Sequence, residues 1–360
     1  MDNSNNLGDG FTCPAPFAKT DRVQLGHGSG GKQTAALVRD LFLRHLSNDI
    51  LAQQTDAAVV GLPTDRIAVS TDTFVVKPLE FPGGNIGSLA VHGTLNDVAM
   101  MGARPVYLTA GFVLEEGLDL EVLDRIVESM GEAVGGVGGV GGVGVPIICG
   151  DTKVVERGKC DGMYVNTTGI GQIDPAFTPS PEKAEPGNVV IVSGPIGRHG
   201  IAVMAKREGL EFDVEIESDA ATLWPLVESL RAEVGNGVHV LRDPTRGGLA
   251  GALNEIASAA GVGILLDEKS IPVPQPVLAA CELLGLDPLH VANEGMFVAV
   301  VERNIADAAL RAMQGHPLGS DAAVIGKVAD TNPGIVALET SVGGTRVVDM
   351  LSGEQLPRIC

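Results

Sequence analysis

Residues 66–103 read RIAVSTDTFVVKPLEFPGGNIGSLAVHGTLNDVAMMGA, and this stretch decides the fold class. Residues 66–76 are rich in Val, Thr and Phe and predict a strand, whereas the Gly/Pro cluster at 81–85 predicts a turn. Apolar residues then recur at helical spacing over 85–103. A strand followed by a helix is the repeating unit of layered α/β proteins, so the stretch favours an α/β or α+β fold.

The same alternation of strand and helix patterns continues on both sides of this stretch. In the first half of the chain, further elements are predicted as helices at 34–46 and 120–134 and as strands at 56–62 and 163–173. Residues 147–155, IICGDTKVV, predict a strand, a tight turn and a second strand. In the second half, the patterns predict a strand at 188–194, a helix at 199–209 closed by Gly209, a helix at 245–261 and a strand at 262–267.

The length of 360 residues suits two domains, and one segment divides the chain. Residues 178–187, TPSPEKAEPG, concentrate proline and charge between two apolar regions. The run GGVGGVGGVGV at 135–145 is predicted to be a loop extension. We therefore expect four segments, which are a disordered leader at 1–21, an N-terminal domain at 22–177, a C-terminal α/β domain at 178–345 and a flexible tail at 346–360.

The charge of the chain excludes several classes of partner. With a formal net charge of −20, its field repels nucleic acid and anionic lipid. An acidic chain still binds a nucleotide where carboxylates hold Mg²⁺ and backbone N–H groups face the phosphates. The five cysteines form no CxxC pair, and the start of the chain lacks the apolar segment of a signal peptide. We expect a reduced cytoplasmic protein that neither enters a membrane nor binds nucleic acid.

The segment GHGSGGKQT at residues 26–34 is similar to a phosphate-binding loop. Its glycines, Gly28, Gly30 and Gly31, allow backbone N–H groups to approach a phosphate, and Lys32 follows them. A Walker A motif needs Ser or Thr after the lysine to hold Mg²⁺, but Gln33 occupies that position. From this segment alone, a phosphate-binding loop and a plain turn before a helix are equal alternatives.

Four aspartates lie in small-residue turns beside apolar strands or helices, and these are Asp56, Asp72, Asp97 and Asp151. Mg²⁺ prefers carboxylate and phosphate oxygens, so aspartates gathered at strand ends would suit a nucleotide–metal site. Each aspartate alone is more often a helix cap or a turn former. Their spacing in the sequence does not establish that they converge.

Four further polar residues are candidates for chemistry. Lys153 lies two residues after Asp151 and points to the same side if that segment is extended. It suits charge neutralisation of phosphate or proton transfer, although a surface lysine is the commoner case. Glu294, between a helical and a strand-like run, has the same ambiguity. Asp243 and Arg246 lie at the start of a predicted helix, where capping is the simpler interpretation.

The most unusual feature is the end of the chain, Pro357-Arg358-Ile359-Cys360. A terminal cysteine has little structural use, because chain ends fray and a frayed thiol packs nothing. The α-carboxylate disfavours the thiolate whereas Arg358 favours it, so its reactivity is predicted to depend on where the tail docks.

These motifs make the sequence similar to the HypE family of hydrogenase maturation proteins, within the PurM-like superfamily that includes selenophosphate synthetase and thiamine-phosphate kinase. The similarity extends from Val23 to Cys360 and is carried by HGSGGK, STDTFVVKPLEFPGGNIG, GTLNDVAMMGA, GDTKVVERG, DPTRGGL, ANEG, HPLG and PRIC. The aspartate and glycine motifs indicate the superfamily, and PRIC selects the HypE family. The glycine run before GDTK is longer than the family pattern.

The resemblance implies an ATP-dependent carbamoyl dehydratase of two-domain PurM-like fold, whose N-terminal domains form a β-barrel across a homodimer. It implies that HypF loads a carbamoyl group onto Cys360, that dehydration converts the group to a thiocyanate, and that a HypC–HypD complex accepts the cyanide for [NiFe]-hydrogenase. By the same resemblance, the expected catalytic residues are Cys360, Lys153 and Glu294, and the expected metal ligands are Asp56, Asp72, Asp97 and Asp151. The residues expected to bind ATP are Gly28, Gly30, Gly31, Lys32, Asp72, Asn96, Asp97, Asp151, Thr152, Asp243 and Arg246.

Two alternative functions stay open from the sequence. Another ATP-dependent enzyme of the superfamily would act on a free small molecule, and Cys360 would then be irrelevant. A non-catalytic scaffold would bind nucleotide and present its tail to partners without releasing phosphate.

Overall fold

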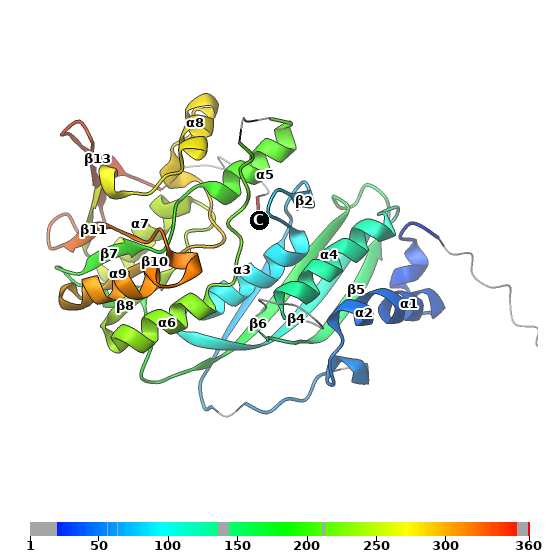
Figure 1. Ribbon diagram of the computed structural model, residues 1–360. Coiled ribbons are helices and arrows are strands. Elements are labelled where there is room, and N and C mark those ends of the chain that lie inside the picture. Colours follow the sequence, from blue (N-terminus) through cyan, green and yellow to red (C-terminus); the bar gives the residue numbers. More distant parts are fainter. Residues whose placement is uncertain are drawn as a thin grey trace, which may run out of the picture.

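The structure of the protein is a computed structural model, which describes residues 20–55, 57–62, 64–135, 144–210, 212, 214–350 and 359–360. Two large sheets organise the chain, one in each half of the molecule (Figure 1). The first sheet has the strand order β1-β6-β4-β5, and the second has the order β13-β12-β9-β11-β7-β10-β8. The C-terminus lies between the two halves, near β2, α3 and α5 (Figure 1).

The first half is a mixed sheet with helices on one face. Its strands are β1 (Ile67–Phe74), β4 (Ala103–Glu115), β5 (Ile147–Val155) and β6 (Met163–Ile173), with a short hairpin of β2 (Glu80–Phe81) and β3 (Gly84–Asn85). β6 pairs antiparallel with β1 and β4, whereas β5 runs parallel to β4. Its helices are η1 (Leu25–Gly28), α1 (Lys32–Leu37), the π-helical η2 (Val38–Phe42), α2 (Leu43–Leu46), η3 (Leu51–Gln53), α3 (Ile86–Met100) and α4 (Leu120–Ala133).

The predicted Gly/Pro turn starts α3 through a side-chain cap. Asn85 accepts hydrogen bonds from the backbone N–H groups of Gly87 at 2.9 Å and Ser88 at 3.1 Å, so two N–H groups of the first turn gain a partner. Gly83 has a φ of +84°, and a Cβ there would stand 2.7 Å from the backbone nitrogen of Ser218. The turn therefore needs glycine both for its conformation and for its close approach to the second half.

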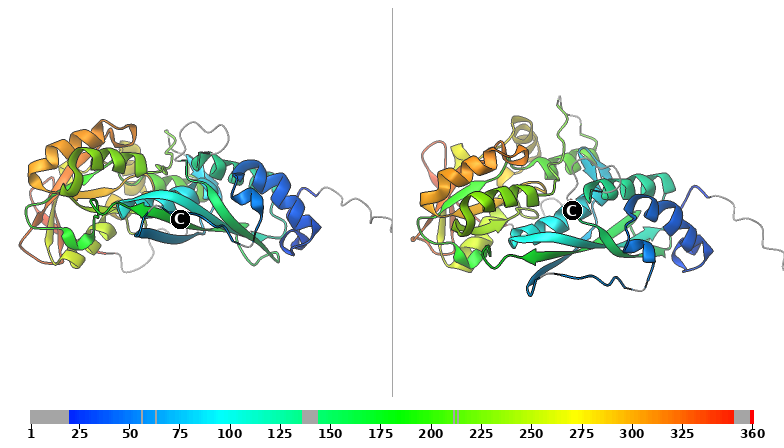
Figure 2. Two further views of the ribbon diagram at one scale, coloured as in Figure 1. Left: turned by 90° about the horizontal axis from the view of Figure 1, so that it is seen from below. Right: turned by 60° about the horizontal axis from the view of Figure 1, so that its bottom comes forward.

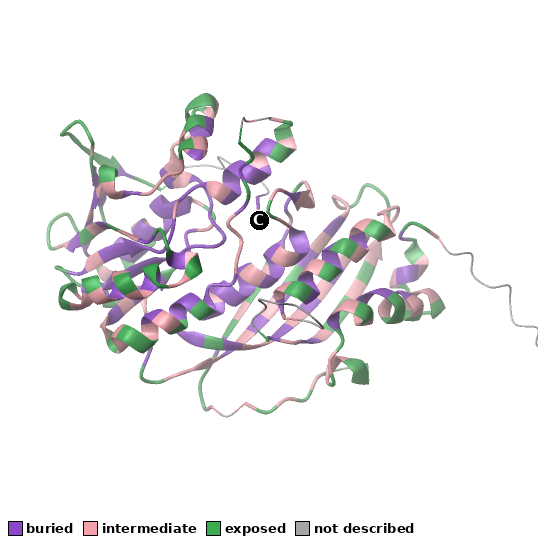
Figure 3. Ribbon diagram, viewed as in Figure 1, coloured by how far each residue is buried: buried purple, intermediate pink, exposed green. Residues whose placement is uncertain are grey.

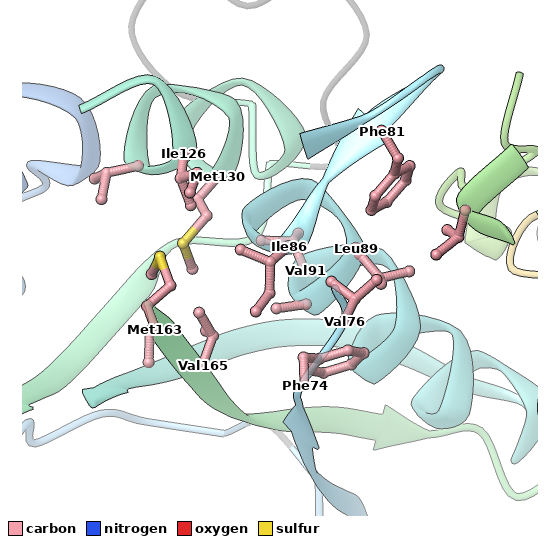
Figure 4. Close-up of a cluster of buried hydrophobic side chains, with 14 of the residues drawn as sticks. Phe74, Val76, Phe81, Ile86, Leu89, Val91, Ile126, Met130, Met163 and Val165 are labelled. Atoms are coloured by element: carbon pink, nitrogen blue, oxygen red, sulfur yellow. The ribbon is translucent and has the colours of Figure 1, made fainter. Parts of the chain in front are cut away.

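An apolar core fixes α3 and α4 on the inner face of the first sheet. Figure 4 shows the centre of this cluster, where Ile86 and Leu89 of α3 lie among side chains from α4, β1 and β6. Burial of each such side chain stabilises the fold by about 1.5–3 kcal/mol. Most of α3 is buried, as Figure 3 shows, so its polar residues are held rigidly inside the molecule.

The outer face of the first sheet remains accessible to solvent. Ile67 and Val69 of β1 point to this face and keep 45% and 59% of their surface exposed, whereas Ala68 and Phe74 point inward and are buried. The views in Figure 2 show α3 and α4 gathered on the opposite face of the sheet. An alternating strand with apolar residues on both faces is typical of a sheet that has a second packing partner.

The second half is a sheet with helices on both faces. Its strands are β7 (Val189–Val192), β8 (Val238–Arg242), β9 (Gly263–Asp267), β10 (Val298–Val301), β11 (Ala323–Ala329), β12 (Val336–Glu339) and β13 (Thr345–Val348). Its longer helices are α5 (Arg198–Glu208), α6 (Trp224–Val234), α7 (Gly248–Ala260), α8 (Gln275–Leu284) and α9 (Ala306–Gln314). Short 3₁₀ turns are η4 (Pro181–Lys183), η5 (Gly235–Gly237), η6 (Glu268–Ser270), η7 (Pro288–His290), η8 (Arg303–Ile305) and η9 (Pro317–Gly319).

Alternation along the central strands divides the core of the second half into two layers. Val190 and Val192 of β7 pack with α7, whereas Ile191 packs with α6 and α9. β10 lies between β7 and β8, and all four of its residues are buried. The loop that precedes β10 is therefore held at a fixed place at the boundary between the two halves.

Most predicted elements are confirmed, and three predictions are wrong. The predicted helices at 34–46, 85–103, 120–134, 199–209 and 245–261 form, as do the strands at 66–76, 163–173, 188–194 and 262–267. Residues 57–62 form no strand, and Val59 there is 94% exposed. Residues 147–155 form one continuous strand without a turn, because β4 pairs with β5 from Leu108 to Glu115. The tail predicted from 346 begins later, since Thr345–Val348 form β13.

Several sequence predictions lie outside the described residues. Residues 1–19 of the predicted leader, 136–143 of the glycine run and 351–358 of the tail are among them, and so is Asp56. Among the helices that the structure describes, none is both long and apolar enough to cross a membrane.

Candidate active site

Five carboxylates from both halves meet at the boundary between the halves. These residues, which we call the acidic cluster, are Asp72, Asp97, Asp219, Asp243 and Glu294. Asp72 points to the inner face of β1, on the same side as Ser70. The Ser70 hydroxyl donates a hydrogen bond of 2.6 Å to Asp97 of α3, which ties strand and helix together at this point.

Burial and neighbouring charges raise the pKa of several carboxyl groups in the acidic cluster. Burial raises the pKa of Asp97 to about 7, and the nearby charges of Asp243 and Asp72 add to the effect, although the Ser70 hydrogen bond opposes it. Burial likewise raises the pKa of Asp243, and it raises that of Glu294 well above its usual value with help from the other carboxylates. Such a group of oxygens favours either a shared proton or a divalent cation.

Asp243 is a member of the cluster and does not cap a helix. The predicted helix begins after Gly247, which makes no side-chain cap, so the capping interpretation is wrong. Gly247 and Gly248 both have positive φ, and a Cβ on Gly248 would stand 2.6 Å from the Leu289 carbonyl oxygen. These two glycines let the chain turn tightly, and Asp243 is only 6% exposed beside β8.

Asp219 is a site residue that sequence reasoning missed. Its carboxylate accepts hydrogen bonds from the backbone N–H groups of Glu294, at 3.2 and 3.3 Å, and of Gly295, at 3.0 Å. A Cβ on Gly295 would lie 1.6 Å from the Asp219 carbonyl oxygen, so only glycine allows this approach. Asp219 lies in a stretch without periodicity, between α5 and α6, and the neighbouring Gly295 was the available signal.

Asn96 supports the same loop from the other side. Its amide nitrogen donates to the carbonyls of Ala221 at 2.9 Å and Glu294 at 3.1 Å, and its oxygen accepts from the N–H of Leu223 at 2.8 Å. These bonds use both donor hydrogens and one acceptor site of the side chain. The geometry assigns Asn96 a supporting position and gives no support to its predicted role as an ATP ligand.

The Glu294 carboxyl group lies over the middle of α3. The side chain is 3% exposed, and a Cβ added to Gly93 would stand 3.6 Å from its Oε2 atom. With its backbone fixed by Asp219 and Asn96, Glu294 is held in one place. A buried carboxyl group with a raised pKa suits proton transfer.

The terminal cysteine is docked against this site. Ile359 is 3% exposed and packs into the cluster that contains Ile201 and Val277. The Val75 N–H donates to the backbone oxygen of Cys360 at 3.4 Å, and the Ile359 carbonyl is 2.6 Å from His199 Nε2. The prediction that the thiol frays and packs nothing is therefore wrong, because its neighbour Ile359 anchors it.

Docking suppresses the reactivity of the thiol. The pKa of Cys360 is raised to about 12, mainly by burial and in addition by the charges of Glu294 and Asp72, whereas Arg246 opposes the rise. The docked thiol is thus protonated at neutral pH. Modification of the sulfur by an external reagent requires the tail to leave this position.

Cys360 in the intact chain is expected to react with iodoacetamide far more slowly than the same cysteine in a peptide of the last residues. A change of pKa from 9.0 to about 12 reduces the thiolate fraction at pH 8 by roughly a thousandfold. Because the thiol pKa is higher in the chain than in the peptide, the thiolate forms at higher pH. The alkylation rate of the chain should therefore keep rising with pH after the rate of the peptide has reached its plateau. Alkylation of Cys360, followed by peptide mass spectrometry across a pH series, measures this. Equal rates in chain and peptide would exclude the docked state.

A second group of predicted residues lies elsewhere, beside β5. The glycine loop packs on this strand, because a Cβ on Gly28 would stand 2.4 Å from the backbone nitrogen of Val154. Lys153 Nζ donates to Asp151 Oδ1 at 2.7 Å, which lowers the pKa of Asp151 and confirms that the two side chains share one side. The Gly30 N–H is already bonded to Thr34 Oγ1 at 2.9 Å, so it is not free for a phosphate. We call residues 28–32 and 151–153 the β5 group.

The β5 group is separated from the acidic cluster within one chain. The pairing register runs from Asp72 through Thr167 and Ala110 to Gly150, across three strand spacings of roughly 4.8 Å each. Asp151 and Lys153 also point to the outer face, whereas Asp72 points inward. Within one chain, Asp72 and Asp97 therefore lie together, whereas Asp151 lies at the other edge of the sheet, and a shared site for all three stays a prediction. In the part of the chain that the structure describes, no group of three potential ligands forms a ready-made metal cage.

Comparison with known proteins agrees with this fold. The chain matches the AIR synthase related protein N-terminal domain over residues 54–173 and the C-terminal domain of the same proteins over residues 185–339. These two domains define an AIR synthase-related protein. The chain is also 54% identical to carbamoyl dehydratase HypE of Cupriavidus necator over 343 residues, which is 95% of this chain and 96% of that protein. The chain belongs to the HypE family of carbamoyl dehydratases.

Solved structures support the same assignment. A crystal structure of hydrogenase maturation protein HypE in complex with ATP is 48% identical, has a TM-score of 0.88 and covers 93% of this chain and 99% of that one. The structure of a HypE–HypF complex is 47% identical, with a TM-score of 0.76 and coverage of 88% and 100%. The resemblance seen in the sequence is thus confirmed.

Proposed function

We propose that this chain dehydrates a carbamoyl group carried on its own Cys360 to a thiocyanate, in an ATP-dependent reaction that serves [NiFe]-hydrogenase maturation. The observation that carries this proposal is the docked terminal thiol, whose neighbours include Glu294, Arg246 and Asp72. An enzyme for a free small molecule would have no use for a terminal cysteine inside its cleft. Family membership and the ATP complex of a close relative support the proposal.

The reaction needs an activated leaving group and a proton acceptor. An amide oxygen leaves poorly, so transfer of the γ-phosphoryl group to the carbamoyl oxygen lets that oxygen depart as phosphate. The C–O bond breaks, the nitrogen loses both protons, and the carbon–nitrogen bond becomes a nitrile. In sum, one water is removed from the carbamoyl group while ATP becomes ADP and phosphate. Glu294 is the candidate proton acceptor, because its buried carboxyl group lies beside the docked thiol.

The acidic cluster fits a magnesium–nucleotide complex. Its donors are carboxylate oxygens, which Mg²⁺ prefers, and a divalent cation would relieve the cost of burying the charged forms of Asp97 and Asp243, which burial and then the nearby charge of Asp72 record as raised pKa values. We assign Asp72, Asp97 and Asp243 as the residues that would hold Mg²⁺ with ATP. Because Mg²⁺ usually keeps waters and phosphate ligands, a complete protein cage is not required. Bound Mg²⁺ supplies neutralisation of phosphate charge.

We propose that a homodimer completes the site. The outer face of the first sheet carries exposed Ile67 and Val69 together with Asp151 and Lys153, so burial against a second copy would cover apolar area. Closure of the two sheets into one barrel would place the edge strand β5 of one chain beside the edge strand β1 of the other, which carries Asp72. This arrangement corresponds to the β-barrel across two N-terminal domains that the family resemblance implies. Lys153 would then act on the carbamoyl group of the partner chain.

Mixing two inactive variants tests the shared site. Lys153→Ala keeps a thiol but lacks the lysine, whereas Cys360→Ser keeps the lysine but lacks the thiol. If each site uses Lys153 from the other chain, mixed dimers contain one complete site, and random pairing should restore nitrile formation to about a quarter of the wild-type level. Differently tagged variants, dissociated and reassociated, allow the measurement by mass spectrometry. A site contained in one chain would give no restoration.

Loading and delivery require other proteins. The HypE–HypF complex of a relative supports HypF as the loading partner, and we propose a HypC–HypD complex as the cyanide acceptor, with both encounters in the cytoplasm. The docked Cys360 is partly buried and its thiol is protonated, so we propose that the tail moves outward to meet either partner.

Intact mass spectrometry tests the proposed function directly. Incubation with HypF, carbamoyl phosphate and ATP should add the mass of one carbamoyl group to the chain, and the mass of one water should then be lost. Tandem fragmentation should place both changes on Cys360. A stable carbamoyl adduct with ATP present would exclude dehydration, and ATP turnover on a free small molecule by a chain lacking Cys360 would favour the alternative enzyme.

A further inference from the structure

His199 makes the shortest described contact to the tail. Its Nε2 atom lies 2.6 Å from the Ile359 carbonyl oxygen, and its Nδ1 atom lies 2.8 Å from the Ser218 hydroxyl oxygen. The imidazole has 0% of its surface exposed, and the ring of Phe81 contacts it edge-on at 5.5 Å between centroids. The ring is therefore held in one orientation by α5, by the loop before α6 and by the β2–β3 hairpin.

The hydrogen-bond partners fix the tautomer of His199. A carbonyl oxygen only accepts, so Nε2 must carry the proton and donate it to Ile359. Nδ1 then accepts from the Ser218 hydroxyl, whose oxygen in turn accepts from the Ala220 N–H at 3.1 Å. The neutral ring satisfies every partner. Burial lowers the pKa of His199 more than the Asp219 charge raises it, which agrees with a neutral imidazole.

This contact acts one peptide unit away from the reactive sulfur. The Ile359 carbonyl belongs to the peptide plane that contains the Cys360 nitrogen, so holding the oxygen limits the directions available to the cysteine side chain. The Val75 N–H holds the Cys360 backbone oxygen at 3.4 Å from the other side. One contact comes from the second half of the molecule and the other from the first, and the terminal residue is clamped between them.

We infer that His199 is a positioning residue, which seats the carbamoylated tail for dehydration through the hydrogen bond from its Nε2–H to the Ile359 carbonyl. The inference rests on the proposed function for its catalytic consequence, although the seating itself is independent of it. When the tail leaves, the buried Nε2–H loses its acceptor, and an unpaired buried donor is unfavourable. His199 therefore biases the tail toward the docked state. Ser218 sets the tautomer, and Ile359 supplies the apolar anchor.

A matched pair of substitutions separates seating from general packing. His199→Gln places an amide N–H near the position of Nε2, whereas His199→Leu fills the space without a donor. In a carbamoylated chain, single-turnover nitrile formation with ATP should fall about tenfold to a hundredfold in the Leu variant. The Gln variant should recover most of the lost rate. Labelling of Cys360 by a maleimide should be faster in the Leu variant and close to wild type in the Gln variant.

Further measurements on the same variants decide whether His199 positions the tail or only packs against it. ATP binding, measured on the same samples, should be unchanged, since His199 does not belong to the acidic cluster. Equal losses in the Gln and Leu variants would reduce His199 to a packing residue, and wild-type rates and labelling in both would overturn the inference. If the wild-type chain formed no nitrile, the proposed function would fail, whereas the labelling difference would still test the seat. Should His199→Leu fold poorly, His199→Asn replaces it, because its shorter amide reaches only the Ser218 side.

Discussion

Replacing Cys360 by serine is expected to abolish the carbamoyl adduct completely while ATP binding is retained. The hydroxyl is a far weaker nucleophile than a thiolate and forms no thioester-like adduct under the same conditions. The stability of the fold should change by less than about 1 kcal/mol, because Ile359 is the buried residue of the apolar anchor site and Cys360 is only partly buried beside it. The mass of the chain after incubation with HypF, carbamoyl phosphate and ATP measures the adduct, and thermal unfolding measures the stability.

A matched thiol variant serves as the control for Cys360. Cys160 is half-buried and its pKa is also raised by burial, to about 11, but it lies away from the cleft on the segment before β6. Cys160→Ser should accept the carbamoyl group like the wild type. An adduct that persists in Cys360→Ser and vanishes in Cys160→Ser would show that Cys160 carries the carbamoyl group. That result would refute the proposed function.

Glu294→Gln should keep the carbamoyl adduct but slow its dehydration by roughly 10²–10⁴-fold. The amide preserves the size of the side chain in its buried site but neither accepts nor releases the proton. Single-turnover mass spectrometry on the carbamoylated variant measures the effect. Glu302→Gln is the matched control, since Glu302 follows β10 whereas Glu294 precedes it, and its side chain is 45% exposed beside His239. Unchanged nitrile formation in Glu294→Gln would remove this residue from the mechanism.

Glu294→Gln is also expected to change how the stability of the nucleotide-free protein depends on pH. The folded state raises the pKa of Glu294 above 4.5, so it binds more protons than the unfolded state at intermediate pH, and stability falls as the pH rises from 4.5 toward the raised value. A glutamine does not titrate and escapes this penalty. Glu294→Gln should therefore melt at a higher temperature than the wild type near neutral pH, and the difference should shrink below pH 4.5. Thermal unfolding at several pH values provides the measurement.

Local patterns predicted the layers of the fold but not the arrangement of the site. The strand, the Gly/Pro turn and the helix at 66–103 follow from residue types and spacing alone. The sequence predicts a turn within residues 147–155, because Gly-Asp favours turns locally. In the structure, pairing with the long β4 keeps the strand continuous. Local spacing carries no information about the partner strand.

The sequence predicted the types of residue at the site but not which of them lie together. Asp72 and Asp151 look alike in sequence. The strand order and the alternation of faces place Asp72 on the inner face, beside the acidic cluster, and Asp151 on the outer face. The residues of an edge strand do not determine where that strand lies in the sheet or which of its side chains face the core. Asp219 and His199 were missed for a related reason, since each is defined by what a distant segment brings to it, namely the loop at Gly295 and the end of the chain.

The uncovered outer face of the first sheet has a consequence for how the protein behaves on dilution. If the β5 group of one copy completes the cleft of another, the number of working centres follows the association equilibrium instead of the amount of folded polypeptide. A well-folded solution at very low concentration would then be catalytically silent, and a cell making little of this protein would produce disproportionately little cyanide.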